Sequence, residues 1–451
     1  ACSPGSAPAR PDAPRRSEKP FDARLPRDEP GMPDATCRAV VGWPILAAYR
    51  GGSYAGRARP ISRRIRGFLC LTAHPDGCAT NVRQLIGLAR AAFPGKGLGS
   101  VLVLGGSTGY GLASLTTAIF GYGADAVTVC FERPTNGDKP ATAGFYNLAE
   151  VHRQAKAAGR SLTTLNADAF AHATKQQAIA ALKALGKPVD LVVYSLASPK
   201  RKDPDSDTVW SSVLKPLGDA YTAKTIDLDN DQVKTVTLPT ATDVERQHTI
   251  KVMGGEDWEL WMDALAAAGL LAPTCRTVAY SYIGPKVTQP IYRGGTIGMA
   301  KDHLEATAHR IHARLNKGGG GAWVSVNKAL VTQASAAIPV VPLYISLLYK
   351  VMKERGTHED TGEQIVRLFK DHIGPDKKPR VDDQGRIRVD DWELHPDVQA
   401  EVDRLWNQVD SSNLAQLSDY TMYKTGFRNL FGFEVPGVDY TQPVEIDAVL
   451  S

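Results

Sequence analysis

Two tyrosines in the middle of the chain are each followed by a lysine that could assist them in proton transfer. Tyr292 is followed by Lys301, and Tyr282 is followed by Lys286. A phenol can donate a proton to a developing enolate, and a nearby ammonium group lowers the phenol's pKa from its usual value of about 10. Either pair could therefore serve a reduction in which hydride transfer is accompanied by protonation.

The spacing of Tyr282 and Lys286 would place both side chains on one face of a helix. Gly284 and Pro285 lie between them. A proline disfavours helical backbone in the residue before it and removes one helical hydrogen bond. We therefore expect no helix here and assign the acid role to Tyr292.

The pair Tyr292 and Lys301 requires a bend in the backbone. On an unbroken helix, nine residues turn through about 900° and would put the two side chains on opposite faces, about 13 Å apart along the axis. Gly294 and Gly295 favour a break, and Thr296 could cap the helix that follows. With that break, Tyr292 can fold back toward Lys301.

A glycine-rich turn indicates a site for a dinucleotide. After the apolar run 101–104 and before a helical pattern, the chain reads Gly105-Gly106-Ser107-Thr108-Gly109-Tyr110-Gly111. Glycines let the backbone approach a pyrophosphate, and the free N–H groups at the start of the helix point toward it. A strand before the turn and a helix after it are the context that this motif requires.

Acidic and small residues after the following strands fit the same cofactor. Phe131 and Glu132 end the next strand, where a carboxylate can accept hydrogen bonds from both hydroxyls of the adenosine ribose and would repel a 2′-phosphate. NADH is therefore favoured over NADPH, although Arg133 could partly compensate a phosphate. Asp168-Ala169 could meet the adenine, and Leu196-Ala197 could line the nicotinamide ribose.

The elements that must position these residues alternate between strand and helix. We expect strands at 66–72, 100–104, 126–131, 161–166, 191–194, 277–281 and 322–326, and helices at 79–92, 112–120, 144–158, 175–185, 258–268 and 300–315. Alternation of this kind predicts an α/β fold, a Rossmann-type doubly wound parallel sheet with helices on both faces. A small β-hairpin insertion is expected at 222–238, and extra C-terminal helices follow residue 333.

Composition indicates an ordinary globular protein of 451 residues, with 43% hydrophobic and 22% charged residues and a formal charge of +5. We expect no nucleic-acid partner and no membrane association, because the charge is slight and no apolar run is long enough to span a bilayer. Scattered cysteines without a C-x-x-C pair favour reduced thiols and a cytoplasmic location. No histidine cluster has metal-ligand spacing, so no metal is expected.

Residues 1–58 differ in composition from the rest. They are rich in Pro, Ala and Arg and lack hydrophobic periodicity. We expect a disordered or non-native extension without a part in the chemistry. Import into an organelle through this segment stays open, although its acidic residues argue against a transit peptide. Residues 59–451 are expected to form a single Rossmann-type domain.

Seven blocks of the sequence, in one order, resemble the FabV-type enoyl-acyl carrier protein reductases and the related trans-2-enoyl-CoA reductases. The blocks are RGFLCLTAHPDGC (66–78), GGSTGYGLAS (105–114), DLVVYSLASP (190–199), KVMGGEDWELW (251–261), YSYIGP (280–285), IYRGGTIGMAK (291–301) and LVTQASAAIPVVPLY (330–344). The resemblance extends from about Arg66 to the C-terminus.

The resemblance implies roles for particular residues. Tyr292 would be the proton donor and Lys301 a cation that contacts the cofactor. Tyr282 would be a third catalytic residue, beside the substrate thioester, where it could act as a second donor. The implied NADH contacts are Gly105, Gly106, Ser107, Thr108, Gly109, Tyr110, Phe131, Glu132, Asp168, Ala169, Leu196, Ala197, Lys301, Val331, Thr332 and Gln333. It also implies a monomer with a substrate lid, acting on enoyl-CoA or enoyl-acyl carrier protein in fatty-acid synthesis or elongation.

This chain departs from the family pattern near the acid. Gln289 and Arg293 stand where family members often have tryptophan, which bears on acyl-chain length rather than on the reaction. The charge run Lys200–Lys202 could meet phosphates, but a solvated run is favoured. A carbonyl-reducing short-chain dehydrogenase and a non-catalytic dinucleotide sensor remain alternatives, because both would share the glycine-rich turn.

Overall fold

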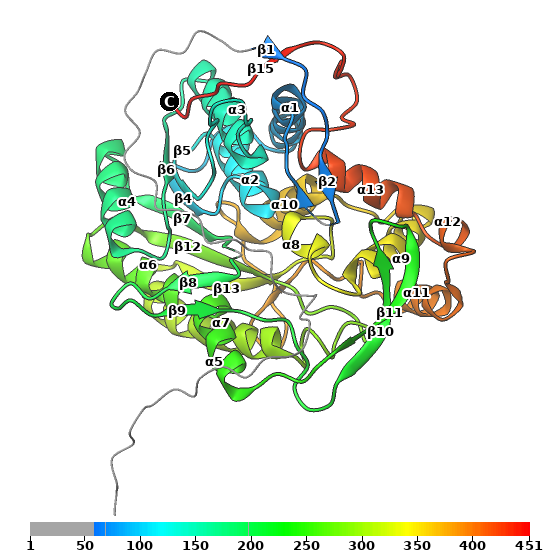
Figure 1. Cartoon of the computed structure of the whole chain (residues 1–451). Helices are drawn as coiled ribbons and strands as arrows, with labels where there is room; N and C mark the ends of the chain where they lie inside the picture. The colour runs from blue at the N-terminus through cyan, green and yellow to red at the C-terminus, as the bar shows by residue number, and fades with distance from the viewer. Residues whose placement is uncertain (1–57, 68, 197) are drawn as a thin grey trace, which may run out of the picture. The chain divides into compact units, whose positions relative to one another are not determined.

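The computed structural model of the chain describes residues 58–67, 69–196 and 198–451 (Figure 1). These residues belong to one compact unit, Tyr54–Ser451. The extension expected at 1–58 falls outside the described residues except for Ala58, so that expectation, like the single domain at 59–451, stays a prediction. No helix in the described ranges has the length and apolar character needed to cross a membrane.

A seven-stranded sheet forms the centre of this unit. Its strand order is β14-β13-β12-β7-β4-β5-β6, and every neighbouring pair is parallel. The strands of this sheet are β4 (Ser100–Leu104), β5 (Asp125–Cys130), β6 (Leu162–Asn166), β7 (Val189–Tyr194), β12 (Leu271–Ser281), β13 (Gly321–Val326) and β14 (Ile387–Arg388). The predicted doubly wound parallel sheet is confirmed.

Helices connect the strands and extend the chain beyond them. They are α1 (Pro75–Ala92), α2 (Gly109–Thr116), η1 (Thr117–Gly121), α3 (Ala143–Ala157), α4 (His172–Leu185), α5 (Asp243–Met253), α6 (Glu256–Ala267), α7 (Thr296–Leu315), η2 (Asn316–Gly318), α8 (Gln333–Ala336), α9 (Val341–Glu354), α10 (Thr361–Leu368), η3 (Phe369–Ile373), α11 (Pro396–Gln408), α12 (Leu414–Leu417) and α13 (Tyr420–Asn429).

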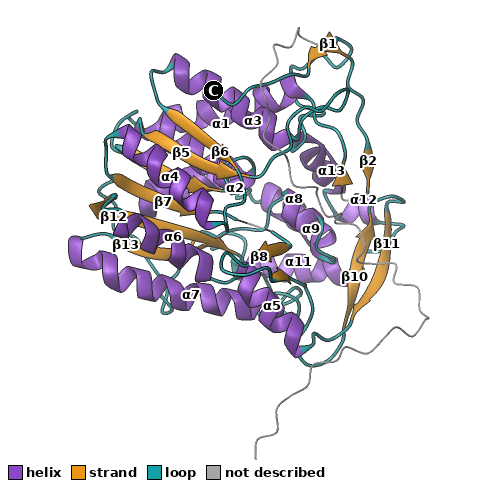
Figure 2. Cartoon of the chain, turned by 60° about the vertical axis from the view of Figure 1, so that its left-hand side comes forward, coloured by secondary structure: helices purple, strands orange, loops and turns teal. Residues whose placement is uncertain are grey.

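Helices cover both faces of the sheet (Figure 2). Val101 and Val103 of β4 pack in a core with α1, α2, α3 and α10, whereas Leu102 and Leu104 pack in a core with α4, α6 and α7. Successive side chains of a strand point to opposite faces. The continuous apolar run of β4 therefore results from burial on both sides.

Short antiparallel pairs lie outside the main sheet. They are β1 (Ala58–Arg59) with β15 (Val444–Glu445), β2 (Ile65–Arg66) with β3 (Leu69–Cys70), β8 (Lys200–Lys202) with β9 (Val209–Ser211), and β10 (Tyr221–Asp227) with β11 (Gln232–Leu238). The last pair confirms the predicted hairpin. The single strand expected at 66–72 is wrong: the segment turns at Gly67, whose φ of +56° suits a glycine, and pairs with itself.

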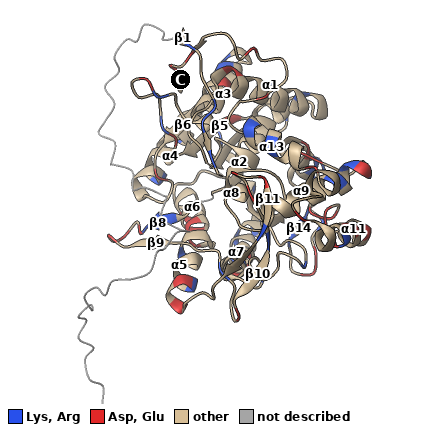
Figure 3. Ribbon diagram, turned by 45° about the vertical axis from the view of Figure 1, so that its right-hand side comes forward, with Lys and Arg blue, Asp and Glu red and all other residues tan. Residues whose placement is uncertain are grey.

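The expectation that Lys200–Lys202 is a solvated charge run is also wrong for the central residue, Arg201. Arg201 is only 2% exposed and its guanidinium lies 2.9 Å from the carboxylate of Glu256. The neighbours Lys200 and Lys202 are exposed, as the alternation of side chains along β8 requires. Elsewhere, acidic and basic residues are interspersed along the ribbon (Figure 3), and several pair across helices, as Arg310 of α7 does with Glu259 of α6.

The C-terminal helices form a third core beside the sheet. Residues of α9, α11 and α13 pack together with the hairpin strand β10, and Tyr292 belongs to the same cluster. Lys224 of β10 donates to the carbonyl of Trp406 at the end of α11 at 2.9 Å. The segment that carries the predicted acid is therefore packed between the Rossmann-type sheet and the C-terminal helices.

A buried ion pair joins two helices of the sheet's α4–α6 face. The side chains of Lys175 and Asp257 are each 2% exposed and lie 2.7 Å apart. Lys175 also donates to the carbonyls of Ala169 and Phe170, at 3.2 and 3.0 Å. Because removing one partner leaves an uncompensated buried charge, Asp257→Ala should lower the free energy of unfolding by about 3–5 kcal/mol in urea titrations.

Asp263→Ala on the same helix is the matched control. Its side chain is 52% exposed and pairs with Arg314 at 2.7 Å. An exposed pair of this kind contributes about 1 kcal/mol or less. If both variants lowered the free energy of unfolding equally, the buried pair would contribute no more to stability than the exposed pair.

Candidate active site

The glycine-rich turn lies where the winding of the sheet reverses. β4 pairs with β5 on one side and with β7 on the other. The loops that leave the carboxyl ends of β4 and β7 therefore run in different directions. Open parallel sheets bind ligands in the crevice at this point. A Cβ on Gly105 would come within 2.2 Å of the carbonyl oxygen of Ser195, and Gly105 has a φ of +87°. Only glycine fits there.

The turn leads directly into α2 and leaves its first N–H groups available. Thr108 is the N-cap residue of α2, and its side chain makes no capping hydrogen bond. The N–H groups in the first turn of a helix have no intrahelical acceptor and favour an anion. Asn147 of α3 donates to the carbonyl of Ser107 at 3.0 Å and so fixes the turn from outside. The geometry suits a pyrophosphate.

Tyr110 contributes only its backbone to this turn. Its hydroxyl lies 2.8 Å from the carbonyl of Lys328 and 2.9 Å from the side-chain oxygen of Gln364. The side chain therefore anchors α2 to α10 and the segment after β13.

Glu132 is held beside the turn by two hydroxyls. Ser107 and Thr142 donate to its two carboxylate oxygens, at 2.6 and 2.5 Å. Burial raises the pKa of Glu132, whereas these hydrogen bonds lower it. The carboxylate stands one strand away from the turn, as expected for a ribose contact. Its neighbour Phe131 is 71% exposed.

Asp168 and Ala169 follow β6, next to β5 at the sheet's edge. The carboxylate of Asp168 accepts from the N–H of Phe170 at 2.9 Å and so shapes its own turn. The carbonyl of Ala169 accepts from Lys175 and, at 3.1 Å, from the indole N–H of Trp261. These contacts fix the loop that was predicted to meet the adenine.

The remaining predicted cofactor residues approach the turn from two sides. A Cβ on Gly105 would lie 3.3 Å from Leu196, and one on Gly109 would lie 4.0 Å from the methyl group of Thr332. Thr332 caps α8 through Ser335. Val331 is buried and Gln333 is exposed. Ala197 lies outside the described residues.

The predicted acid packs against its neighbouring tyrosine. The rings of Tyr282 and Tyr292 meet edge to face, with centroids 4.8 Å apart and an interplanar angle of 82°. Tyr292 is 6% exposed, and its hydroxyl has no hydrogen-bond partner among the described residues. Residues 286–294 form turns, so no helix contains Tyr282 and Lys286, as predicted.

The predicted break before α7 is confirmed, but its cap is not Thr296. Gly295 occupies the N-cap position and Thr296 is the first helical residue. The Thr296 hydroxyl instead donates to the carbonyl of Val213 at 2.5 Å. A Cβ on Gly295 would lie 2.6 Å from the carbonyl of Ile291, so the tight bend itself requires glycine.

Lys301 extends from α7 to the end of β12. Its ammonium donates to the carbonyl of Tyr280 at 3.2 Å, two residues before Tyr282. Burial lowers the pKa of Lys301 to about 8. Burial, and secondarily the charge of Glu393, raise the pKa of Tyr292. We expected Lys301 to lower the pKa of Tyr292. That expectation is wrong for the protein's own residues, because desolvation of the phenol outweighs any lowering of its pKa by the lysine.

A buried carboxylate that sequence reasoning missed adjoins the tyrosines. Glu393 is fully buried and accepts from the hydroxyls of Tyr282 and Tyr344, at 2.9 and 2.7 Å. It follows β14, about a hundred residues after Tyr292 in the chain. No local motif marks it, because it lies in the segment for which the sequence predicted only extra C-terminal helices.

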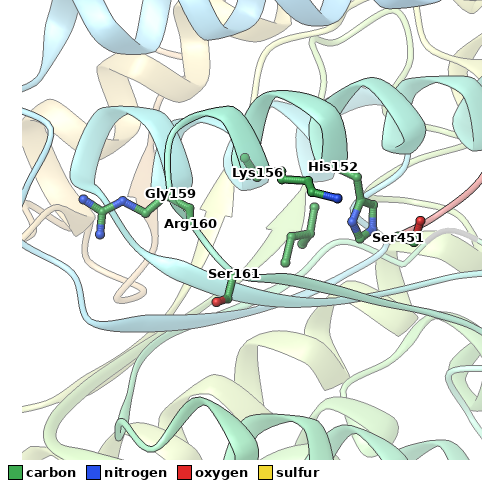
Figure 4. Close-up of a pocket in the computed structure, with 8 residues that line it drawn as sticks. His152, Lys156, Gly159, Arg160, Ser161 and Ser451 are labelled. Carbon is green, nitrogen blue, oxygen red and sulfur yellow. The ribbon is translucent and has the colours of Figure 1, made fainter.

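A separate hollow of about 380 Å³ opens between the end of α3 and the start of β6 (Figure 4). His152, Lys156, Arg160 and Ser161 line it. Loops that enter parallel strands lie at the amino edge of a sheet, opposite the glycine-rich turn. This hollow is not part of the candidate active site.

The parallel sheet, the glycine-rich turn at its switch point and the carboxylate after the next strand define a dinucleotide-dependent oxidoreductase of the Rossmann type. Models of known families match most of the described chain. A "NAD(P)H binding domain of trans-2-enoyl-CoA reductase" matches residues 60–137, and a "Trans-2-enoyl-CoA reductase catalytic region" matches residues 139–373. The chain belongs to the trans-2-enoyl-CoA reductase family.

Individual relatives agree. An enoyl-[acyl-carrier-protein] reductase [NADH] of Opitutus terrae is 52% identical over 386 residues, 85% of this chain and 98% of the relative. The trans-2-enoyl-CoA reductase of Treponema denticola, solved with NAD, is 45% identical with a TM-score of 0.83, covering 87% of this chain and all of that one. The enzyme of Clostridium acetobutulicum, solved with NADH, is 41% identical with a TM-score of 0.83, covering 86% and 98%. The predicted family, fold and NADH-dependent enoyl reduction are confirmed.

A third family model, described as an enoyl reductase FAD-binding domain, matches residues 381–444. In this chain those residues form β14 and α11–α13, with no strand, glycine turn and helix in succession among them. The hollow beside α13 measures about 60 Å³ and is lined by Tyr420, Tyr423 and Phe427, among others. The strand, glycine turn and helix that mark the NADH-binding motif therefore have no counterpart in this segment.

The glycine-rich turn yields a direct test of dinucleotide binding. A Cβ on Gly111 would lie 2.0 Å from the carbonyl oxygen of Gly105. Overpacking of this kind costs about 1–3 kcal/mol, so Gly111→Ala should weaken NADH binding about 5- to 150-fold in a fluorescence titration.

Gly87→Ala serves as the control. Gly87 is an exposed residue of α1, and a Cβ there has no heavy atom within 4 Å. NADH affinity should stay unchanged in this variant. Unchanged affinity in Gly111→Ala would remove the turn from the binding site.

Proposed function

We propose that this chain reduces the C2=C3 bond of a trans-2-enoyl thioester with NADH, using Tyr292 as the proton donor. The observation that carries the proposal is a buried phenol whose hydroxyl has no partner among the described residues, at the edge of the sheet that holds the glycine-rich turn. Such a hydroxyl can donate to a substrate without first breaking a hydrogen bond to the protein.

NADH and Tyr292 have separate roles in the reaction. NADH, when bound, supplies a hydride to C3 of the conjugated thioester. Tyr292 supplies the proton that completes the reduction, and its hydroxyl stabilises the negative charge that develops on the thioester oxygen. Burial is the main cause of the raised pKa of Tyr292, so the phenol is protonated at neutral pH but is a weaker acid than a free phenol.

The cofactor would lie along the carboxyl edge of the sheet. The turn 105–110 and the start of α2 would hold the pyrophosphate, and Glu132 would accept from the adenosine ribose. Asp168-Ala169 would border the adenine, and Leu196 the nicotinamide end. Thr332 would lie beside the turn at Gly109, with Val331 and Gln333 next to it as further cofactor contacts. Lys301 would contribute a positive charge near the nicotinamide ribose, because its ammonium already lies at the end of β12.

Enoyl thioesters are the substrate class that the names of the relatives support. Among carriers, acyl carrier protein is the proposal, because the relative from Opitutus terrae, at 52% identity, is named for it. Kinetics with enoyl-CoA and enoyl-acyl carrier protein of equal chain length would decide this. A monomeric state, a cytoplasmic location and the absence of nucleic-acid or membrane partners stay predictions.

Removing the Tyr292 hydroxyl tests the assigned acid. Tyr292→Phe should lower kcat with crotonyl-CoA by about 100-fold or more, since general acid catalysis is typically worth that much, while NADH still binds. Tyr122→Phe, in a ring that packs against Phe93 and Phe369, is the control and should retain kcat. Near-normal turnover by Tyr292→Phe would exclude it as the acid.

The same assay separates the alternatives. A carbonyl-reducing dehydrogenase would oxidise NADH with ketones and not with crotonyl-CoA. A non-catalytic dinucleotide sensor would bind NADH but show no oxidation in a single turnover with either substrate.

The lowered pKa of Lys301 predicts a pH dependence. Its ammonium is present below a pH of about 8 and is lost as the pH rises through that value. If the charge binds cofactor, kcat/KM for NADH, which reports the free enzyme, should fall above a pH of about 8. In Lys301→Arg, whose side chain stays charged, that decline should disappear.

Lys328 is the internal control, because burial also lowers its pKa to about 8. If the decline persists in Lys301→Arg, Lys328 or another group causes it, and Lys301 has no such role.

A further inference from the structure

Glu393 is surrounded by hydrogen-bond donors. One carboxylate oxygen accepts from the hydroxyls of Tyr282 and Tyr344, and the other accepts from the N–H of Ala329 at 2.6 Å. The residue is completely buried. Burial raises the pKa of Glu393, whereas the three hydrogen bonds and the positive charge of Lys328 lower it. Since all three partners donate, the geometry suits the ionised carboxylate.

This arrangement distinguishes the two tyrosines of the candidate site. A phenol has one proton to donate. Tyr282 gives its proton to Glu393, so its oxygen can offer only lone pairs to another group. The hydroxyl of Tyr292 has no such commitment among the described residues. A thioester carbonyl can only accept, so Tyr292 alone can serve it without first breaking a hydrogen bond.

The two phenols are also linked mechanically. Their rings meet at 82° with centroids 4.8 Å apart, and edge-to-face pairs of this kind are favourable. The hydrogen bond from Tyr282 to Glu393 fixes the position of one ring, and that ring borders the other. Displacements of about 1 Å near a reacting group can cost on the order of 100-fold in rate.

We propose that Glu393 is a positioning residue for the reduction: it takes the proton of Tyr282 and holds that ring against Tyr292, leaving Tyr292 as the proton donor of the pair. The inference rests on the proposed function, because it assumes that Tyr292 is the acid. It assigns Tyr282 the role of a support rather than of a second donor.

Electrostatics acts in the same direction. The charge of Glu393 helps to raise the pKa of both Tyr282 and Tyr292, after burial as the main cause. Both phenols therefore stay protonated around neutral pH. Other titratable groups near the carboxylate are Tyr110, Tyr344, Tyr349, Lys328 and Glu359.

Glu393→Gln is the informative substitution because an amide cannot repeat the carboxylate's contacts. The N–H of Ala329 can only donate, so the amide oxygen must face it and the amide NH2 must face the tyrosines. The hydrogen bond to Tyr282 then reverses and the Tyr282 proton is released. We expect kcat with crotonyl-CoA to fall about 10- to 100-fold, with the Kd for NADH changed by less than about twofold because the glycine-rich turn is untouched.

A double-mutant cycle shows whether the effect passes through Tyr282. Tyr282→Phe removes the same hydrogen bond while keeping the ring, so it should lower kcat similarly, and the double variant should lose little more than either single variant. Multiplicative losses would overturn the proposal. So would a kcat within about twofold of wild type in Glu393→Gln.

Tyr344→Phe is the matched control, since it deletes the other phenol bound to the same carboxylate oxygen. It should keep kcat within about twofold of wild type. If Glu393→Gln fails to fold, as judged by circular dichroism, the comparison of Tyr282→Phe with Tyr344→Phe decides: equal losses refute the proposal. Failure of the proposed function would look different, because Tyr292→Phe would then keep near-normal turnover with crotonyl-CoA.

Discussion

The close approach of Gly105 to the carbonyl of Ser195 is the constraint on which the rest of the candidate site depends. A Cβ at Gly105 would come within 2.2 Å of that oxygen, so the loops after β4 and β7 diverge from almost the same point. In a parallel sheet covered on both faces, only the edges remain open to a ligand. The direction in which the chain winds reverses between β4 and β7, and this reversal opens one crevice at the carboxyl edge of the sheet. The predicted cofactor residues that the structure describes lie in loops at this edge.

How much could be predicted from the sequence depended on whether the signal was local. The run Ser100–Leu104, the glycine-rich turn and Glu132 each carry their own signature, and the structure assembles them as expected. Gly294 and Gly295 likewise predicted the break before α7. Local patterns gave a wrong prediction where burial depends on packing. Arg201 belongs to a charge run in the sequence, yet the alternation of side chains along its strand buries it against Glu256.

Glu393 could not be found in this way because its environment is built from distant segments. Its partners come from the ends of β12 and β13 and from α9, between 49 and 111 residues away in the chain. Burying a carboxylate without donors costs several kcal/mol, so such a residue persists only where other segments supply them. A single sequence contains no periodicity or spacing that reports this convergence. The raised pKa of Tyr292 escaped prediction for the same reason, because desolvation is a property of the assembled core.

The C-terminal helices therefore belong to the chemistry as well as to the fold. Without them the Rossmann-type sheet would still present the glycine-rich turn and Glu132, but Tyr292 would lose the core it shares with α9, α11 and α13. Exposed to water, a phenol and an ammonium group would both titrate near their ordinary values. Enclosure shifts the pKa of Lys301 down to about 8 and that of Tyr292 upward. A dinucleotide-binding unit thus acquires a donor-bearing site through residues that the dinucleotide motif itself does not contain.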